Sequence, residues 1–177
     1  IMSLALILLV VAMTFRQYGI LSTRFLAFCL TCYAVGPGLI VNGILKRSSG
    51  RVRPRDAEMF GGDGAFYPFL DFSGPCESSC SFSSGEASAI ATVAAILLIA
   101  VVPRLQISKR FIARLCIIII AIGGSALRVV VGAHYLSDVV FSWIIVFPLV
   151  LGLHSVFQIS SSASLVRCRW FQLSSSA

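Results

Sequence analysis

Three short clusters of polar residues, 46–54, 83–86 and 128–138, stand out because each lies where a long apolar segment begins or ends. Ionisable groups at the edge of a membrane core are costly to desolvate and are usually functional. Their residue types suit anion chemistry, since lysine and arginine bind anions, helix N-termini attract them and an activated histidine attacks them. We therefore expect these clusters to carry the chemistry of the chain.

The first cluster is cationic and reads K-R-S-S-G-R-V-R-P. Six residues separate Lys46 from Arg53, and Pro54 ends any helix there. A basic flank of a membrane span usually marks the cytoplasmic side, but the charge distribution described below places this one outside. Arginine makes bidentate contacts with phosphate and lysine adds a point charge, so the cluster indicates phosphate binding by Lys46 and Arg53.

The second cluster reads S-S-G-E and precedes an apolar segment. Small residues at a helix N-terminus leave backbone N–H groups free, and the helix dipole favours an anion there. Ser84 and Gly85 are therefore candidate phosphate ligands. The alternative is a plain N-cap by Ser84 with the acid Glu86 in the first turn, and the cluster taken alone favours that alternative.

The third cluster places Arg128, His134 and Asp138 at spacings of six and then four residues. Residues four apart share a helix face, so we expect Asp138 to accept a hydrogen bond from one ring nitrogen of His134. That bond would fix the tautomer and direct the lone pair of the other nitrogen outward. A lone histidine near a membrane is usually only interfacial, as we expect for His154, but Arg128 beside His134 favours a catalytic group.

The elements that must position these clusters are membrane spans. The chain has 177 residues, of which 58% are hydrophobic and 12% charged, with a mean hydropathy of +0.95. A transmembrane helix needs about 20 mostly apolar residues, and five blocks meet or approach this length: 1–15, 25–45, 87–102, 111–131 and 139–157. The sequence therefore predicts an all-α, polytopic transmembrane helical bundle in one domain, 1–158, followed by a cytoplasmic tail, 159–177.

The first block, 1–15, is short and starts without an initiator methionine, so we expect the N-terminus to be truncated. A signal peptide is the competing interpretation, but the block lacks a basic start and a small-residue cleavage site. The second block contains Gly36-Pro37-Gly38, which should kink its helix. The segment after it is rich in glycine and proline and should form an irregular loop.

Five alternating spans place basic and acidic residues on different faces. One face has no acid and carries Arg16, Arg24, Arg104, Lys109, Arg110, Arg114, Arg167 and Arg169. Every Asp and Glu lies on the other face or at its edge. Because short basic loops mark the cytoplasmic side, the loop 46–85 and the turn at His134 should face outward. The net charge of +7 then requires no nucleic acid partner.

Six cysteines divide in a similar way. Four lie in spans or in the tail, where small buried hydrophobes are expected: Cys29, Cys32, Cys116 and Cys168. Cys76 and Cys80 lie in the outward loop, and a disulfide between them would fit an oxidising compartment. Two cysteines are too few for a structural zinc site, and we expect no metal.

In this order and on one face, K-x6-R-P, S-G at a span start and R-x5-H-x3-D resemble the three signature motifs of the type-2 phosphatidic acid phosphatase (PAP2) family, over residues 46–138. The resemblance implies a six-helix bundle, with one helix before residue 1, and a reaction without metal or cofactor. It implies that His134 is the nucleophile that forms a phosphohistidine and that Asp138 orients it. The implied phosphate ligands are Lys46, Arg53, Arg128, Ser84 and Gly85.

Three positions depart from the family pattern. Ser83 stands where the family usually has proline, and Leu127 where it usually has serine. More important, Glu86 replaces the histidine that usually protonates the leaving group. A free glutamate is mostly ionised at neutral pH and is a poor acid, so we hypothesise that bound substrate keeps Glu86 protonated as the general acid. Contact with a cationic or hydroxyl-rich headgroup is the rival role.

Residues 80–88, C-S-F-S-S-G-E-A-S, are similar to a Gram-negative branch related to lipid A phosphatases. We therefore expect a phosphatase of the bacterial inner membrane with a periplasmic active site and lipid A as substrate. Phosphatidylglycerophosphate, phosphatidate and a polyprenyl diphosphate are alternative substrates. A lipid phosphotransferase, a transporter that binds phosphorylated solutes through Arg53 and Arg128, and an inactive binding relative are alternative functions. The sequence predicts no particular oligomeric state.

Overall fold

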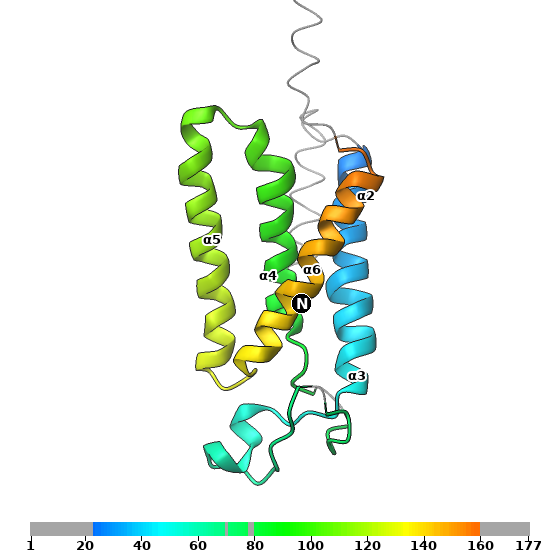
Figure 1. Cartoon of the computed structure of the whole chain (residues 1–177), viewed down its shortest axis with the longest axis vertical. Helices are drawn as coiled ribbons and strands as arrows, with labels where there is room; N and C mark the ends of the chain where they lie inside the picture. Colours follow the sequence, from blue (N-terminus) through cyan, green and yellow to red (C-terminus); the bar gives the residue numbers. More distant parts are fainter. Residues whose placement is uncertain (1–22, 70, 78–79, 160–177) are drawn as a thin grey trace, which may run out of the picture.

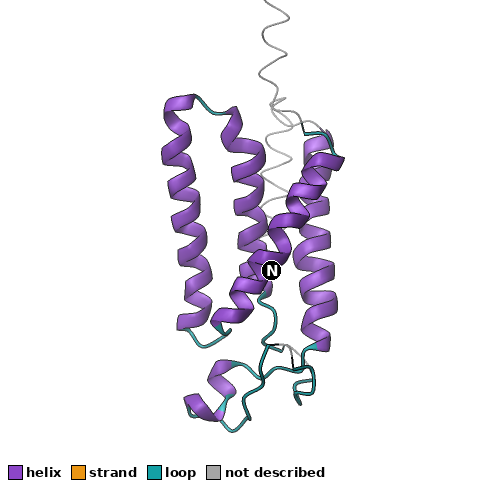
Figure 2. Cartoon of the chain, in the orientation of Figure 1, coloured by secondary structure: helices purple, strands orange, loops and turns teal. Residues whose placement is uncertain are grey.

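The structure, a computed structural model, describes residues 23–69, 71–77 and 80–159, which form a bundle of long helices (Figure 1). Figure 2 shows only helices and loops in this part of the chain. Four helices are long and apolar enough to cross a membrane: Thr23–Ser48, Gly85–Arg104, Ile107–Val130 and Leu136–Val156. The expected all-α membrane bundle is therefore confirmed, with four of the five expected spans. The remaining one, 1–15, lies outside the described residues.

The first described span consists of α2 (Thr23–Tyr33), the π-helix η1 (Ala34–Leu45) and the short α3 (Lys46–Ser48). Pro37 lies inside η1. Proline has no N–H to donate, and its ring crowds the preceding turn. The helix therefore widens into π-helical turns at the residues where the sequence predicted a kink.

The second span, built from α4 (Gly85–Ile96), η4 (Leu97–Val101) and η5 (Val102–Arg104), is the central element of the bundle. It packs against η1, α5 (Ile107–Val130) and α6 (Leu136–Val156). Its buried face is lined by small residues, among them Ala87, Ser88, Ala91, Thr92 and Ala95. Small side chains let helix backbones approach closely, and this close packing holds helices together in lipid.

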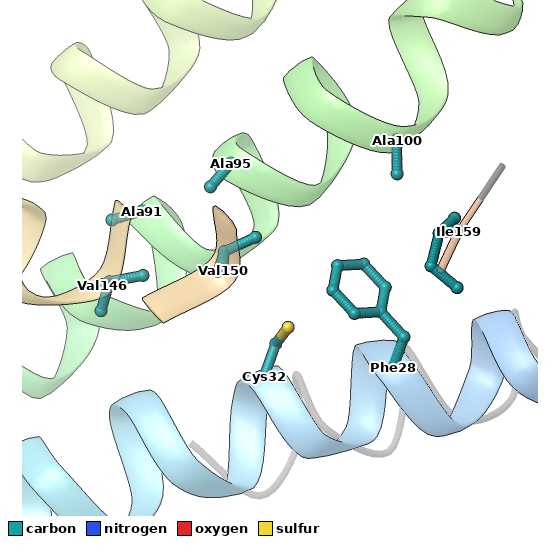
Figure 3. Close-up of a cluster of buried hydrophobic side chains, with 8 residues drawn as sticks. All are labelled: Phe28, Cys32, Ala91, Ala95, Ala100, Val146, Val150 and Ile159. Atoms are coloured by element: carbon teal, nitrogen blue, oxygen red, sulfur yellow. The ribbon is translucent and has the colours of Figure 1, made fainter. Parts of the chain in front are cut away.

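A cluster of buried apolar side chains fills the space between α2, α4, η4 and α6 (Figure 3). Its members are Phe28, Cys32, Ala91, Ala95, Ala100, Val146, Val150 and Ile159. Figure 3 shows Phe28 and Cys32 pointing from α2 toward the alanines of the central span. This packing fixes α6 against α4, and both helices carry residues of the candidate site at their N-termini.

The third span, α5, lies at the edge of the bundle. Only 11% of its apolar window is buried, against 56% for the span Gly85–Arg104. Its outward surface is apolar and includes Ile118, Ile119, Ile120 and Ile122. An exposed apolar helix of this length suits a lipid environment. α5 packs against one side of α4, and its last turn places Arg128 in the site.

The loop 49–84 closes the end of the bundle where α3 ends and α4 begins (Figure 1). Its described residues form two short 3₁₀ turns, η2 (Pro54–Asp56) and η3 (Glu58–Phe60), and are otherwise irregular. The loop crosses itself at Gly50, which has a φ of +56°, and a Cβ there would clash with the carbonyl group of Gly74. Glycine permits both this backbone conformation and this close approach. The crossing brings the residues before α4 beside the first polar cluster.

Candidate active site

The three polar clusters meet at the end of the bundle where α4 and α6 begin and α5 ends (Figure 1). Arg128 of the third cluster forms an ion pair of 2.6 Å with Glu86 of the second. Arg51 of the first cluster forms an ion pair of 2.5 Å with Asp138 of the third. Lys46 of the first cluster lies close enough to Glu86 for the two charges to interact. Residues far apart in the sequence are thus gathered into one polar site.

His134 is held by a backbone carbonyl rather than by a carboxylate. Its Nδ1 lies 2.7 Å from the carbonyl oxygen of Ser81, and because a carbonyl only accepts, Nδ1 carries the proton. In the neutral imidazole Nε2 then keeps its lone pair, which is the form that a nucleophile needs. The residue is only 3% exposed, so the imidazole is shielded from bulk water.

Asp138 lies beside His134 without the hydrogen bond that the sequence predicted. Its Oδ2 is 3.8 Å from Nδ1, which is an ion-pair distance but too long for a hydrogen bond. The spacing of four residues is misleading because α6 begins at Leu136, so His134 precedes the helix and shares no helical face with Asp138. The carboxylate instead accepts from the Tyr135 N–H at 2.9 Å and acts on His134 through its charge.

Two residues that the sequence did not single out hold the Asp138 carboxylate, which is fully buried. The hydroxyl of Ser81 donates to Oδ2 at 2.5 Å, and Nη1 of Arg51 donates to Oδ1 at 2.5 Å. The available signals were weak. Arg51 is an additional cation inside the first cluster, and Ser81 lies in a serine-rich run, but neither spacing nor periodicity connects them with Asp138.

Arg128 and Glu86 form the part of the site that opens to the outside, with side chains 36% and 46% exposed. Nη1 of Arg128 lies 2.6 Å from Oε2 of Glu86, the distance of a charge-assisted hydrogen bond. Nε of Arg128 is buried and has no hydrogen-bond partner among the described residues. A second donor of the same guanidinium is therefore available to an anionic ligand.

Ser84 and Gly85 start α4 as the sequence predicted. The Ser84 side chain is the N-cap and accepts from the Ala87 N–H at 3.2 Å. This cap occupies one first-turn N–H group and leaves the positive end of the helix dipole facing the site. A Cβ on Gly85 would lie 2.6 Å from Oδ1 of Asn42, so glycine allows η1 to approach the start of α4.

Lys46 and Arg53 lie on either side of the start of the loop. Lys46 directly follows η1, is partly buried, and experiences the charges of Arg53 and Glu86. The backbone just beyond Arg53 is anchored to the α5–α6 turn, where the Arg55 N–H donates to the Gly132 carbonyl at 3.0 Å. The first cluster is thereby attached to the turn that carries the histidine.

Cys76 and Cys80 form a disulfide. The bridged segment is bound to the first cluster on both sides, because the Cys76 N–H donates to the Gly50 carbonyl at 3.0 Å and the Ser81 N–H donates to the Arg51 carbonyl at 2.8 Å. Cys80 is fully buried and adjoins Ser81. The disulfide therefore restrains the residue whose carbonyl and hydroxyl groups hold the histidine and the buried aspartate.

This arrangement suits nucleophilic attack on a phosphate group. A shielded imidazole with an available Nε2 lone pair shares the site with three cationic side chains, Lys46, Arg53 and Arg128. Phosphoryl transfer is promoted mainly by positioning and by charge stabilisation of this kind. Among the described residues, no group of three or more His, Cys, Asp or Glu side chains could hold a metal ion.

Comparison with known proteins gives a consistent result. The family model for the PAP2 superfamily matches residues 25–161. A lipid A 4′-phosphatase of Francisella tularensis subsp. novicida (strain U112) is 38% identical over 121 residues, which cover 68% of this chain and 52% of the relative. A lipid A 4′-phosphatase of Rhizobium leguminosarum is 40% identical over 122 residues, which cover 67% and 50%.

A third relative, the lipid A 4′-phosphatase of Rhizobium etli (strain ATCC 51251 / DSM 11541 / JCM 21823 / NBRC 15573 / CFN 42), is 40% identical over 122 residues, covering 67% of this chain and 46% of the relative. The chain thus spans about half the length of the curated relatives it matches. No solved structure matches the chain.

Reduction of the Cys76–Cys80 disulfide is expected to loosen the segment that carries Ser81. A bridge that closes so short a loop contributes about 2 kcal/mol by chain entropy, which corresponds to about a 30-fold change in a local opening equilibrium. Hydrogen exchange of the detergent-solubilised protein, followed by mass spectrometry, should show the Ser81 amide exchanging faster by up to this factor. The variant Cys116→Ser, which removes an exposed free thiol, should leave exchange unchanged. Equal exchange before and after complete reduction would contradict the expectation.

Proposed function

Because the chain belongs to the PAP2 superfamily, we propose that it is a membrane-embedded lipid phosphate phosphatase whose nucleophile is His134. The proposed substrate is lipid A, and the phosphate proposed to be removed is its 4′-phosphate. The three curated relatives are named for that activity. The proposed reaction uses no metal ion and passes through a phosphohistidine.

One observation carries the proposal. The buried imidazole of His134 has its Nδ1 2.7 Å from the carbonyl oxygen of Ser81. It lies at the same end of the bundle as Arg128, whose buried Nε has no hydrogen-bond partner among the described residues. A nucleophile beside anion ligands is what phosphoryl transfer requires. A transporter of phosphorylated solutes would need the cations but not an imidazole held in one tautomer.

In the proposed first step, the substrate phosphate binds Lys46, Arg53 and Arg128 and faces the N-terminus of α4. The Nε2 lone pair of His134 attacks phosphorus in line with the bond to the lipid oxygen. The P–N bond forms while the P–O bond breaks, and the electron pair of the P–O bond leaves with the lipid oxygen. Asp138, 3.8 Å from Nδ1, stabilises the positive charge that the imidazole gains.

Glu86 is proposed to give a proton to the leaving lipid oxygen. Without substrate, its carboxylate is paired with Arg128 at 2.6 Å. A bound phosphate competes for the same guanidinium and displaces the carboxylate, which then faces an anion and takes up a proton. The Glu86 side chain is 46% exposed, so solvent can deliver this proton.

In the proposed second step, a water molecule attacks the phosphorus of the phosphohistidine. The ionised Glu86 accepts one proton from this water, the P–N bond breaks, and His134 regains its lone pair. One lipid phosphate and one water thus give the lipid alcohol and inorganic phosphate. If a lipid alcohol replaced water, the same residues would perform phosphotransfer.

We place the proposed site at the periplasmic face of a bacterial inner membrane. The described Asp and Glu residues lie in loop 49–84 or in the first turns of α4 and α6, all at the site end of the bundle. The opposite end has no acid among the described residues and carries Arg24, Arg104, Lys109, Arg110 and Arg114. Basic ends favour the cytoplasmic side, and a disulfide near the site suits an oxidising compartment.

The detergent-purified protein is expected to release inorganic phosphate, with EDTA present, from lipid A that carries a 4′-phosphate and not from lipid A that carries only the 1-phosphate. His134→Ala should slow release by about 10⁴-fold or more, because the nucleophile is lost. His154→Ala is the matched control, since this histidine packs against Phe28 at the opposite end of the bundle, and it should retain activity.

Phosphatidylglycerophosphate, phosphatidate and a polyprenyl diphosphate complete the panel. Preference for one of these lipids would identify a different substrate but would still support a phosphatase. Absence of release from every lipid by folded protein would contradict hydrolysis, and a doubly phosphorylated lipid product would indicate phosphotransfer.

Glu86→Gln is expected to lower kcat on lipid A by about 10²-fold, because glutamine cannot protonate the leaving oxygen. Hydrolysis of p-nitrophenyl phosphate should fall much less, since nitrophenolate departs without a proton. The matched control is Glu58→Gln, which neutralises an exposed acid of the outer loop and should leave both rates unchanged. Full turnover of lipid A by Glu86→Gln across the pH range would exclude the acid role, and a raised KM with unchanged kcat would indicate headgroup contact.

A further inference from the structure

We infer that Arg51 is a positioning residue of the active site: its guanidinium holds the Asp138 carboxylate in place and thereby sets the orientation and tautomer of His134. This inference rests on the proposed phosphatase function for its kinetic consequences. It assigns a role to an arginine that lies between Lys46 and Arg53 in the sequence and differs from both.

The guanidinium of Arg51 donates to three protein groups through Nη1 and Nε. Nη1 donates to Asp138 at 2.5 Å and to the Ser137 hydroxyl at 2.9 Å, while Nε donates to the Tyr67 carbonyl at 2.8 Å. The guanidinium carbon, Cζ, lies 4.0 Å from the centre of the Tyr135 ring, which adds a cation–π contact. Arg51 therefore joins the outer loop to the first turn of α6.

Arg51 is also covered, which separates it from the residues proposed to bind phosphate. It is 3% exposed, whereas the Arg128 side chain is 36% exposed. The Phe66 ring lies 5.5 Å away as a second aromatic neighbour. Burial raises the pKa of Tyr135, so its phenol stays neutral beside the guanidinium. A buried cation that is bonded to protein groups should affect turnover rather than substrate affinity.

The importance of this cation follows from the burial of Asp138. A buried carboxylate that loses its cationic partner is strongly unfavourable, and only neutral donors would remain directly bonded to it: the Ser81 hydroxyl and the Tyr135 N–H. The carboxylate would then move or take up a proton. Either change removes the negative charge that stabilises the imidazole as it becomes cationic.

Ser81 transmits the effect to the histidine. Its hydroxyl donates to Asp138 at 2.5 Å, and its carbonyl accepts from Nδ1 of His134 at 2.7 Å. Its N–H is bound to the Arg51 carbonyl at 2.8 Å. A shift of the carboxylate therefore displaces the residue that fixes the tautomer of His134. The backbone bond between Arg51 and Ser81 survives side-chain substitution, so a variant at Arg51 tests the guanidinium itself.

The kinetic test compares Arg51→Met and Arg51→Lys with Arg55→Met, which removes an exposed arginine of the same loop. Arg51→Met should lower kcat for phosphate release from lipid A by about 10- to 100-fold, because a hydrogen bond to the charged Asp138 carboxylate is lost, with KM nearly unchanged. Arg51→Lys should recover part of the loss, because lysine restores the positive charge but not the planar guanidinium with its fixed donors. Arg55→Met should match the parent protein. A rise in KM without a fall in kcat would overturn the inference in favour of direct phosphate binding.

A double-mutant cycle with Asp138→Asn separates positioning from a loss of folded protein. If Arg51 acts through Asp138, adding Arg51→Met to Asp138→Asn should cause little further loss of kcat. Independent, multiplicative losses would overturn the inference. Thermal unfolding in detergent measures the folded fraction, and rates are expressed per folded molecule.

A substrate-free readout distinguishes failure of this inference from failure of the proposed function. The ¹⁵N shifts of the His134 ring report which nitrogen is protonated. The parent protein should show the Nδ1–H tautomer, and Arg51→Met should show a mixture of tautomers. An unchanged tautomer in Arg51→Met would overturn the positioning role whether or not the parent protein releases phosphate. A changed tautomer in a protein that releases none would support positioning and reject the phosphatase.

Discussion

The fully buried carboxylate of Asp138 sets the condition that the rest of the site must meet. Desolvating a carboxylate costs on the order of several kcal/mol, so the charge persists only where good partners surround it. The residue before α6 supplies the Tyr135 N–H, the segment before α4 supplies Ser81, and the start of the loop 49–84 supplies Arg51. Three segments far apart in the sequence are thus fixed around one carboxylate, and His134 lies against the same group.

The membrane explains why this network lies at the ends of helices. Unpaired polar groups are too costly within the hydrocarbon, so the spans meet through small and apolar side chains, and their charged residues gather where the spans end. Gly85 lets η1 approach the start of α4. The crossing of the loop at Gly50 and Gly74 returns the chain over that end. Close backbone approach, made possible by glycine, therefore brings the first two clusters together.

Sequence reasoning predicted the spans well, because the bilayer imposes a hydrophobic length that can be counted directly. It also identified polar clusters that the structure brings together, since ionisable groups at the edge of a membrane core are costly to desolvate and are usually functional. It missed Arg51 and Ser81 because they lie in irregular segments, where no period indicates which side chains meet. Their bonds to Asp138 span 87 and 57 residues. The direct bond expected between His134 and Asp138 was wrong because helical spacing does not apply to a residue before the helix.

Formation of a covalent bond between phosphorus and His134 is the central claim, and trapping that intermediate tests it most directly. The purified protein would be mixed rapidly with lipid A labelled with ³²P at the 4′-phosphate and quenched in alkali. We predict that label remains on the full-length chain, survives alkali, is lost in acid, and maps by mass spectrometry to the peptide that contains His134. Steady release of phosphate with no labelled chain at any time, or label on another residue, would contradict the proposed mechanism.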